Sequence, residues 1–269
     1  MPMTLLPLVK IEPTSYPAIN AILGLVLSNV QAVIGAHFHG MYLFGSLASG
    51  GFNPHSSDID FVVVTDSDLP NELLSRLRSM HADIAASGLE WARELEGFYI
   101  PRDYLRRYNP AQRFPSIGVD WDFNVGGQDS AGVIMRHILR EQGIVLAGPP
   151  LRELIDPVTA AQIRQAATQI LIDWWVPRLA DPAQLLRSDY QAYAVLTMCR
   201  MLYTLATGAV VSKPAAARWT LENHDPRWKT LIHRALDWQH GMEMDSLAET
   251  LDFIRYTFEH SQPTPPETG

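Results

Sequence analysis

The chain has 269 residues, 47% of them hydrophobic, which is enough to fill the core of one large domain or two ordinary ones. Its 21 Lys and Arg residues are outnumbered by 29 Asp and Glu residues, and the net charge of -8 shows no basic bias of the kind typical of nucleic-acid-binding proteins, so polymer nucleic acid is not an expected partner. The single cysteine, Cys199, has no partner for an internal disulfide, and its apolar neighbours predict a reduced core thiol.

The first residues carry no pattern typical of export or membrane insertion. The start, MPMTLLPLVK, is broken by Pro7 and has no basic region before its apolar stretch. We also expect no apolar run to approach the roughly 18 to 20 residues of a membrane span. These features predict a cytoplasmic protein that contacts no membrane.

The first half of the chain alternates helices and strands. Apolar spacing predicts a helix over 16–34, and strands are predicted over 40–46 and 57–66. A helix over 71–87 and a strand over 95–101 follow. The stretch 102–130, rich in proline and glycine, is expected to be mostly loop, with a short strand around DWDFNV. This order predicts an α/β domain over residues 1–150, built from a small mixed sheet with flanking helices.

The pattern changes after LAGPPLRELIDPV, residues 146–158, whose glycine and prolines predict a hinge. Beyond it, little strand pattern remains, and the spacing predicts an all-α helical bundle over residues 151–260. The tail SQPTPPETG, residues 261–269, is predicted to be disordered. The expected helices of the bundle cover residues 159–176, 188–206, 214–222, 227–239 and 245–259.

Two aspartates open the second predicted strand. Residues two apart in an extended strand point to the same face, with Cα atoms about 6.6 Å apart, so Asp58 and Asp60 converge while Ile59 turns into the core. Two carboxylates on one face repel each other unless a cation lies between them. Mg²⁺ suits such oxygen ligands, and it completes its shell with water and substrate phosphates. The pair therefore predicts a magnesium site that binds a nucleoside triphosphate.

A glycine-rich segment precedes this pair. Gly45 and Ser46 are expected to form a tight turn whose backbone N–H groups and hydroxyl approach the phosphates, and Gly50 and Gly51 to let the connecting segment pass closely. No G-K-[ST] follows, which excludes a Walker-type loop. Taken singly, these features also fit an alternative, a flexible loop leading to a solvated strand.

The combined stretch GSLASGGFNPHSSDID, residues 45–60, resembles the signature of the DNA-polymerase-β-like nucleotidyltransferase superfamily. The resemblance implies that Gly45, Ser46 and Ser57 hold the triphosphate and that Asp58 and Asp60 bind two Mg²⁺. It also implies a third carboxylate, on a neighbouring strand, that completes the metal site or acts as general base. The implied reaction moves a nucleoside monophosphate and releases pyrophosphate.

Glu96 is the acid available for that third position, on the strand 95–101. Glu96, RYNPA at 107–111, Trp121 and the segment at 146–158 follow one another much as in the aminoglycoside 3''- and 9-adenylyltransferases. This second resemblance implies that Glu96 is the catalytic base for a drug hydroxyl and that Trp121 lines the drug pocket. The alternatives are a surface role for Glu96 and a core position for Trp121.

The helical half resembles the same enzymes over residues 193–219, where an Arg and a Lys are expected to reach the triphosphate. The matching positions are Arg200 and Lys213. An arginine in the middle of an apolar helix needs an anionic partner. For Arg200, the alternative is an internal salt bridge with Asp189 or Glu222, and for Lys213 a solvated side chain. If both bind the nucleotide, its binding is expected to close the hinge.

The acceptor side departs from the enzymes that modify streptomycin. The positions of their two drug-binding aspartates here hold Tyr190 and Leu186, and the loss of those carboxylates disfavours a cationic guanidino sugar. The candidates for contacts with the acceptor are Trp121, Asp120, Asp122, Glu96, Asp189 and Tyr190.

Together, these features predict a monomeric, cytoplasmic, Mg²⁺-dependent nucleotidyltransferase that confers antibiotic resistance. It would move AMP from ATP to a hydroxyl of a small cationic acceptor, an aminoglycoside or aminocyclitol such as spectinomycin. Two alternatives stay open. One is a nucleotidyltransferase that acts on a protein side chain, and the other is a non-catalytic regulator that binds a nucleotide.

Overall fold

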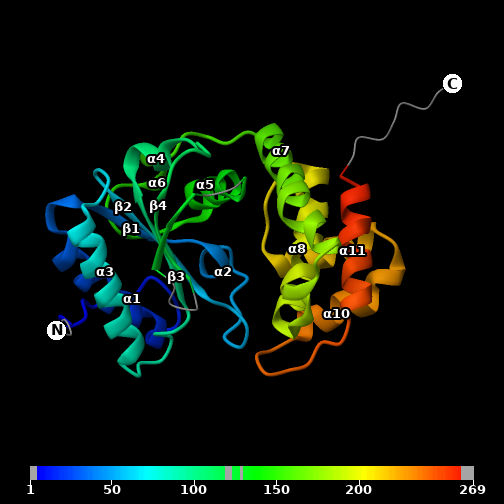
Figure 1. Ribbon diagram of the computed structural model, residues 1–269, viewed down its shortest axis with the longest axis horizontal. Coiled ribbons are helices and arrows are strands. Elements are labelled where there is room, and N and C mark those ends of the chain that lie inside the picture. The colour runs from blue at the N-terminus through cyan, green and yellow to red at the C-terminus, as the bar shows by residue number, and fades with distance from the viewer. Residues whose placement is uncertain (1–4, 119–122, 128–129, 262–269) are drawn as a thin grey trace. The chain divides into compact units, whose positions relative to one another are not determined.

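The computed structural model describes residues 5–118, 123–127 and 130–261. The chain divides into two compact units, shown in Figure 1, which are described separately. The first comprises Met1–Phe52, Ser57–Gln128 and Met135–Pro157. The second comprises Asn53–Ser56, Asp129–Ile134 and Val158–Gly269. The domain boundaries predicted from the sequence stay a prediction, and the tail beyond Ser261 lies outside the described residues.

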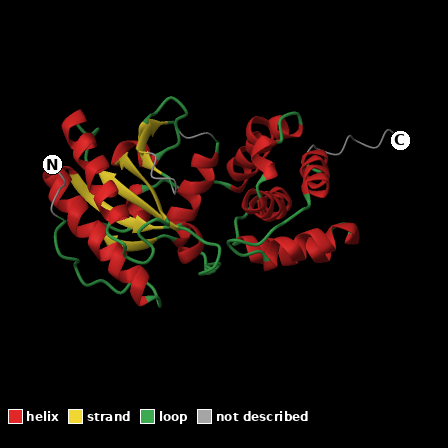
Figure 2. Ribbon diagram, turned by 60° about the horizontal axis from the view of Figure 1, so that its bottom comes forward, coloured by secondary structure: helices red, strands yellow, loops and turns green. Residues whose placement is uncertain are grey.

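The first unit is built on a six-stranded mixed sheet with the order β5-β4-β3-β2-β1-β6. Figure 2 shows its strands in yellow with helices around them. The central strands β2 and β3 run parallel, and the other neighbouring strands pair antiparallel. This mixed sheet with flanking helices confirms the predicted fold class. The strands are β1 Phe38–Leu43, β2 Ile59–Thr65, β3 Leu95–Pro101, β4 Phe114–Ile117, β5 Phe123–Gly126 and β6 Ile144–Ala147.

Alternation along the central strands divides the core into two layers. Ile59, Phe61 and Val63 of β2 belong to the cluster that contains the apolar faces of α1 and α3. Val62 and Val64 belong to the second cluster, with residues of α4, α5 and α6. Helices therefore cover both faces of the sheet at β2. The helices are α1 Pro17–Ile34, α2 Gly45–Ala48, α3 Asn71–Ala86, α4 Arg102–Arg106, α5 Ala131–Gln142 and α6 Leu151–Leu154.

Helix α1 corrects one expectation from the sequence. Its segment Pro17–His37 has a mean hydropathy of 1.7, and it is the one helix among the described residues that is long and apolar enough to cross a membrane. However, 67% of its most apolar window is buried, and Ile19 and Leu23 are fully buried in the core. Packing against the sheet accounts for this composition, because a core helix is buried on most of its surface.

The predicted helices and strands up to residue 101 are confirmed, but the stretch 102–130 is not mostly loop. Part of it forms α4 and the strand β4, which lies between β3 and β5, whereas the edge strand β5 confirms the short strand predicted around DWDFNV. Gly45 and Ser46 begin the short helix α2 instead of the predicted tight turn. Gly50 adopts a φ of +70°, a conformation that favours glycine, and a Cβ there would meet open space. The glycine therefore permits this backbone conformation, and the expected close passage of the connecting segment is not found at this position.

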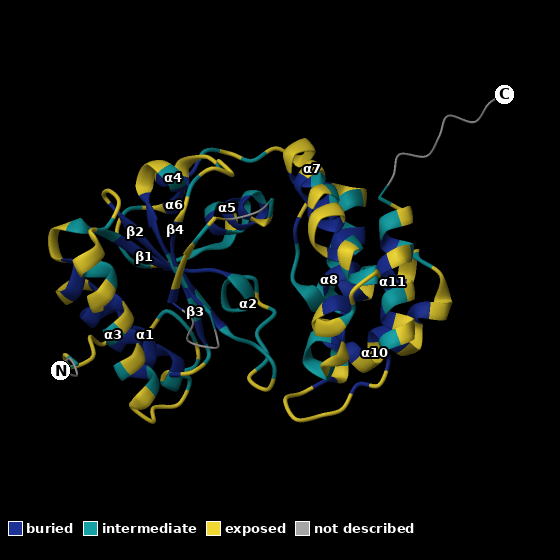
Figure 3. Ribbon diagram, viewed as in Figure 1, coloured by how far each residue is buried: buried dark blue, intermediate teal, exposed yellow. Residues whose placement is uncertain are grey.

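The second unit is a helical bundle, as predicted. The long helix α8 contacts α7, α9, α10 and α11, and it carries fully buried Ala194, Val195 and Met198. Figure 3 shows buried residues on the strands of the sheet and on parts of the helices. The helices are α7 Ala160–Ile170, α8 Ser188–Thr207, α9 Lys213–Asn223, α10 Lys229–Asp237 and α11 Leu247–Glu259, and a π-helical turn, Leu171–Trp175, continues α7.

Local chemistry sets the ends of these helices. Thr159 and Gln162 form a capping box at the start of α7, in which the Thr159 hydroxyl accepts from the Gln162 amide and the Gln162 side chain accepts from the Thr159 amide. Helix α8 ends at Gly208, which takes the left-handed conformation with a φ of +71°. Cys199 of α8 is a free, fully buried thiol whose pKa is raised to about 12 by burial, which confirms the predicted core thiol.

Candidate active site

Two of the predicted carboxylates lie side by side on the central strands. Asp60 is the second residue of β2 and Glu96 the second of β3, and the two are register partners in the parallel pair. Both are half-buried, whereas the residues on either side of each are buried. Since Ile59 and Phe61 pack toward α1 and α3, Asp60 lies on the other face of the sheet, and Glu96 shares it by register.

Asp58 directly precedes β2 and is half-buried. Its spacing from Asp60 puts both on one face if the extended backbone continues for that one residue. Within the described parts of the chain, no group of three or more His, Cys, Asp or Glu side chains is arranged to hold a metal ion. Mg²⁺ usually takes one or two protein carboxylates, so the aspartate pair suits it without a third ligand. The assignment of Glu96 to the metal stays a prediction.

Gly45 allows a carboxylate to lie against the backbone at the start of α2. Its φ is +65°, and a Cβ at this position would collide with the Asp60 carboxylate. The Phe44 amide also donates a hydrogen bond to the Asp60 carbonyl oxygen at 3.2 Å. A glycine is therefore required here for two reasons, its left-handed backbone and the approach of Asp60.

Ser46 carries a buried hydroxyl that has no hydrogen-bond partner in the part of the chain that the structure describes. Its Oγ is one of the buried side-chain atoms that form no hydrogen bond among the described residues. A buried hydroxyl left without a hydrogen bond costs roughly 1–3 kcal/mol, so it indicates a ligand atom that completes the bond. Together with the glycine at position 45, this hydroxyl fits an oxygen-rich anion such as a phosphate.

The helical unit contains the predicted cations. Arg200 lies in the middle of α8, half-buried, and forms no hydrogen bond or ion pair with any residue that the structure describes. The alternative of an internal salt bridge is wrong, because Asp189 pairs with Arg187 at 2.5 Å and Glu222 has no partner among the described residues. Lys213 is the first residue of α9.

The predicted acceptor residues are divided between described and undescribed segments. Asp120, Trp121 and Asp122 lie outside the described residues. Tyr190 lies in the first turn of α8, next to Asp189. Its hydroxyl accepts a hydrogen bond from the Trp174 indole at 3.3 Å. Partial burial alone would raise the pKa of Asp189, but the hydrogen bond and charge of Arg187 outweigh it and lower that pKa below its ordinary value.

An aromatic cluster around Tyr190 was not predicted from the sequence. The Tyr190 ring lies 5.5 Å from that of Tyr193 and 6.1 Å from that of Trp175, measured between centroids. The Arg178 guanidinium lies 3.8 Å from the Trp174 ring centroid. The spacing of Tyr190 and Tyr193, three residues apart on one helix, is the signal that could have indicated it.

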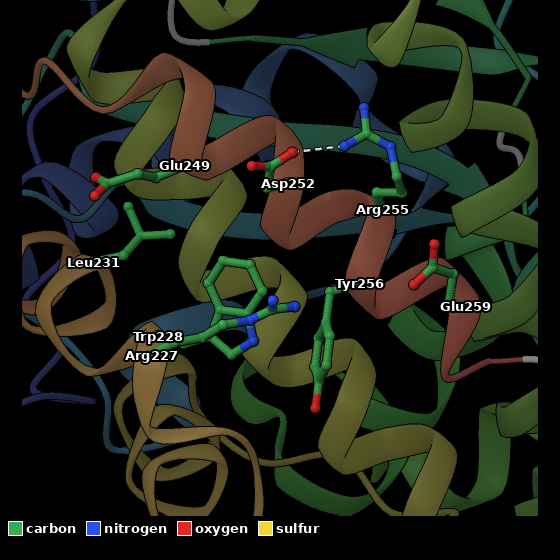
Figure 4. Close-up of a pocket in the computed structure, with 8 residues that line it drawn as sticks. All are labelled: Arg227, Trp228, Leu231, Glu249, Asp252, Arg255, Tyr256 and Glu259. Carbon is green, nitrogen blue, oxygen red and sulfur yellow. Dashed lines mark hydrogen bonds and ion pairs between the residues drawn. The ribbon is translucent and has the colours of Figure 1, made fainter.

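A cavity of about 410 Å³ lies elsewhere in the second unit, between α11 and the turn Pro226–Trp228 (Figure 4). No predicted site residue lines it. Its charged groups are largely engaged, since Asp252 pairs with Arg255 at 2.5 Å and the Arg227 guanidinium stacks 4.3 Å from the Trp228 ring centroid. The predicted functional residues therefore do not coincide with this cavity.

Two families match separate parts of the chain. Residues 39–107, which contain Gly45, Asp58, Asp60 and Glu96, match the family described as "Nucleotidyltransferase domain". Residues 153–261, which contain Arg200 and Lys213, match the family described as "Aminoglycoside adenylyltransferase, C-terminal domain".

Curated relatives span most of the chain. The aminoglycoside (3'') (9) adenylyltransferase of Escherichia coli is 29% identical over 250 residues, covering 86% of this chain and 91% of the relative. The spectinomycin 9-adenylyltransferase of Staphylococcus aureus is 29% identical over 209 residues, covering 72% and 75% respectively. The fold is similar to that of spectinomycin adenyltransferase AAD(9) from Enterococcus faecialis, solved with ATP and spectinomycin, with a TM-score of 0.71, 20% identity and coverage of 89% and 98%.

Proposed function

Because the chain is an aminoglycoside (3'')(9) adenylyltransferase-like enzyme of the nucleotidyltransferase superfamily, we propose that it moves AMP from ATP to a hydroxyl of a small cationic acceptor. Pyrophosphate is the other product. The observation that carries this proposal is the register pair of Asp60 and Glu96 beside the glycine-serine start of α2. This arrangement supports the assignment of Asp60 to a metal ion, of Glu96 to the general base and of the start of α2 to the phosphates.

The nucleotide binds at the start of α2. Ser46 donates its unpartnered hydroxyl to a phosphate oxygen, Ser57 contributes a second hydroxyl, and Gly45 keeps the backbone close to Asp60. Asp58 and Asp60 hold Mg²⁺, which when bound neutralises charge on the triphosphate and on the departing pyrophosphate. Their half-buried position and two-residue spacing support this role.

Glu96 is the general base. Its carboxylate takes the proton of the acceptor hydroxyl as that oxygen attacks the α-phosphorus, and the bond to pyrophosphate breaks. Register pairing puts Glu96 on the same face of the sheet as Asp60, which supports its assignment as the base and not as a surface residue distant from the proposed site.

Arg200 and Lys213 neutralise the triphosphate from the helical unit. Arg200 supports this most directly, because a half-buried guanidinium without a described partner suits a multiply charged anion. Hinge closure on binding then follows as part of the proposal.

The acceptor is an aminoglycoside or aminocyclitol, with spectinomycin as the leading candidate. Relatives named for spectinomycin support this assignment. Streptomycin is disfavoured because Tyr190 and Leu186 offer no carboxylate and Asp189 is neutralised by Arg187. Asp120, Trp121 and Tyr190 complete the proposed acceptor contacts. The enzyme would act as a monomer in the cytoplasm and confer antibiotic resistance.

The test of Glu96 separates catalysis from nucleotide binding. Glu96→Gln is expected to keep Mg-ATP affinity within about twofold and to lower acceptor-dependent AMP transfer about 10²- to 10⁴-fold, the usual contribution of a general base. Glu94→Gln, two residues earlier, is the matched control and should leave both unchanged. Full transfer by Glu96→Gln would exclude Glu96 as the base. If wild type binds ATP but transfers AMP to no acceptor, the regulator alternative replaces this proposal.

A further inference from the structure

Lys213 occupies an electrostatically unfavourable position. It is the first residue of α9, directly after the N-cap Ser212, whose side chain makes no capping hydrogen bond. The start of a helix carries partial positive charge, so a cation there is repelled, whereas an anion is favoured. A contact that stabilises the ammonium offsets part of this repulsion.

Tyr193 of α8 supplies such an interaction. The Lys213 Nζ lies 4.3 Å from the centroid of the Tyr193 ring, within the range of an attractive cation–π contact. Tyr193 is 40% exposed, so its ring lies at the surface of the helical unit and not in its core.

The ring itself is held in place by its neighbours. Its centroid lies 5.9 Å from that of Trp175 and 5.5 Å from that of Tyr190. Trp175 is 1% exposed and belongs to the packed interior of the bundle. The aromatic cluster therefore connects a flexible lysine to a rigid part of the unit.

We propose that Tyr193 is a positioning residue that holds the Lys213 ammonium ready for the phosphates of the nucleotide. The inference rests on the proposed role of Lys213. An ammonium has three N–H donors, and the ring face uses the positive charge without consuming all of them. A lysine already held against a ring loses less conformational freedom when it binds a phosphate, and affinity rises accordingly.

The test measures binding of a non-hydrolysable Mg-ATP analogue by calorimetry, without any acceptor. Tyr193→Leu is expected to weaken binding about 3- to 5-fold, the fold-change of an exposed cation–π contact, and Tyr193→Phe to retain wild-type affinity because the ring face is kept. In a Lys213→Met background, Tyr193→Leu should cause no further loss. Tyr203→Leu is the matched control, since Tyr203 also joins α8 to α9, through Trp219, and should not change affinity.

A second readout is independent of nucleotide. The readout is the NMR spectrum of protein whose lysines carry ¹³C-labelled dimethyl groups. The lysines of the sequence are Lys10, Lys213 and Lys229, so this spectrum contains few lysine signals. The Lys213 signal should be shifted by the ring in wild type and Tyr193→Phe, and lose that shift in Tyr193→Leu.

These outcomes distinguish the two proposals. Equal losses from Tyr193→Leu with and without Lys213 would mean a merely structural role and overturn the inference. An unshifted Lys213 signal in a protein that binds Mg-ATP would overturn it while leaving the proposed function intact. If wild type fails to bind the analogue although Lys213 is shifted, the proposed nucleotide site fails first, and the positioning role fails with it.

Discussion

At the scale of single residues, the absence of a side chain at Gly45 is as important to the site as any carboxylate. A Cβ there would occupy the space of the Asp60 carboxylate, and the backbone is left-handed. Gly50, five residues later, has a similar φ of +70° but open space around it. A side chain at either glycine would strain the backbone, but only a side chain at position 45 would also collide with Asp60. Comparing the two positions therefore distinguishes the two effects.

Gly45→Ala is expected to weaken Mg-ATP binding at least about tenfold, because Asp60 must move, whereas Gly50→Ala should leave binding unchanged. Both should lower the free energy of unfolding by about 1–2 kcal/mol through left-handed strain. Calorimetry with Mg-ATP and denaturant titrations measure the two effects. Equal binding by both variants would contradict the proposed approach of Asp60 to the nucleotide.

The site was only partly predictable from the residues. The two-residue spacing of Asp58 and Asp60 predicts their shared face, because side chains alternate along a strand. The pairing of Asp60 with Glu96 depends on the register of two strands 36 residues apart, which no local pattern encodes. The contact of Lys213 with Tyr193 likewise requires the packing of α8 on α9.

At the scale of elements, a buried histidine joins α3 to β3. The His81 Nε2 lies 2.6 Å from the Tyr99 hydroxyl, and both side chains are about 1% exposed. Burial lowers the pKa of His81 to about 3 and raises that of Tyr99. His81 is therefore neutral in the folded protein near pH 7, and its partner Tyr99 lies three residues after Glu96 on β3.

The lowered pKa of His81 predicts a loss of stability in acid. The unfolded state binds a proton near pH 6.5 that the folded state excludes until about pH 3, so the stabilising effect is complete above 6.5 and declines below it. This contribution to the unfolding free energy should fall by up to about 1.4 kcal/mol per pH unit between those values.

Denaturant titrations of wild type and His81→Gln at several pH values test this. The stability difference between them should shrink as the pH falls from 6.5 to 4.5, because Gln does not titrate. The pKa values of His137 and His224 are also lowered, but these shifts are present in both proteins and cancel in the stability difference. A difference that does not change with pH would show that His81 is not held neutral by burial.

Most helices and strands were predictable because their hydrophobic residues recur at a regular spacing. The strands β4 and β6 were not predicted because they lack such a pattern. Strand β4 contains Pro115, and a proline normally argues against a strand. Strand β6 has four residues, too few for alternation to be recognised, and it is fixed by its pairing with Met41, Tyr42 and Leu43 of β1. Such elements depend on a neighbouring strand and not on their own sequence.

At the scale of the whole molecule, the proposed reaction uses carboxylates from the sheet unit and cations from the helical unit. Periodicity alone separated the two architectures, since strand-rich and helix-rich patterns meet near the prolines at 149–157. The identity of the acceptor is a property of few side chains, and neither architecture determines it.

The most direct test of the account is pyrophosphate release from Mg-ATP, with spectinomycin, streptomycin and other aminoglycosides added one at a time and Asp60→Asn as the blank. We predict release that depends on spectinomycin, with a product heavier by one AMP, and no release with streptomycin. No acceptor-dependent release with any of these compounds, in protein shown separately to bind Mg-ATP, would contradict the account.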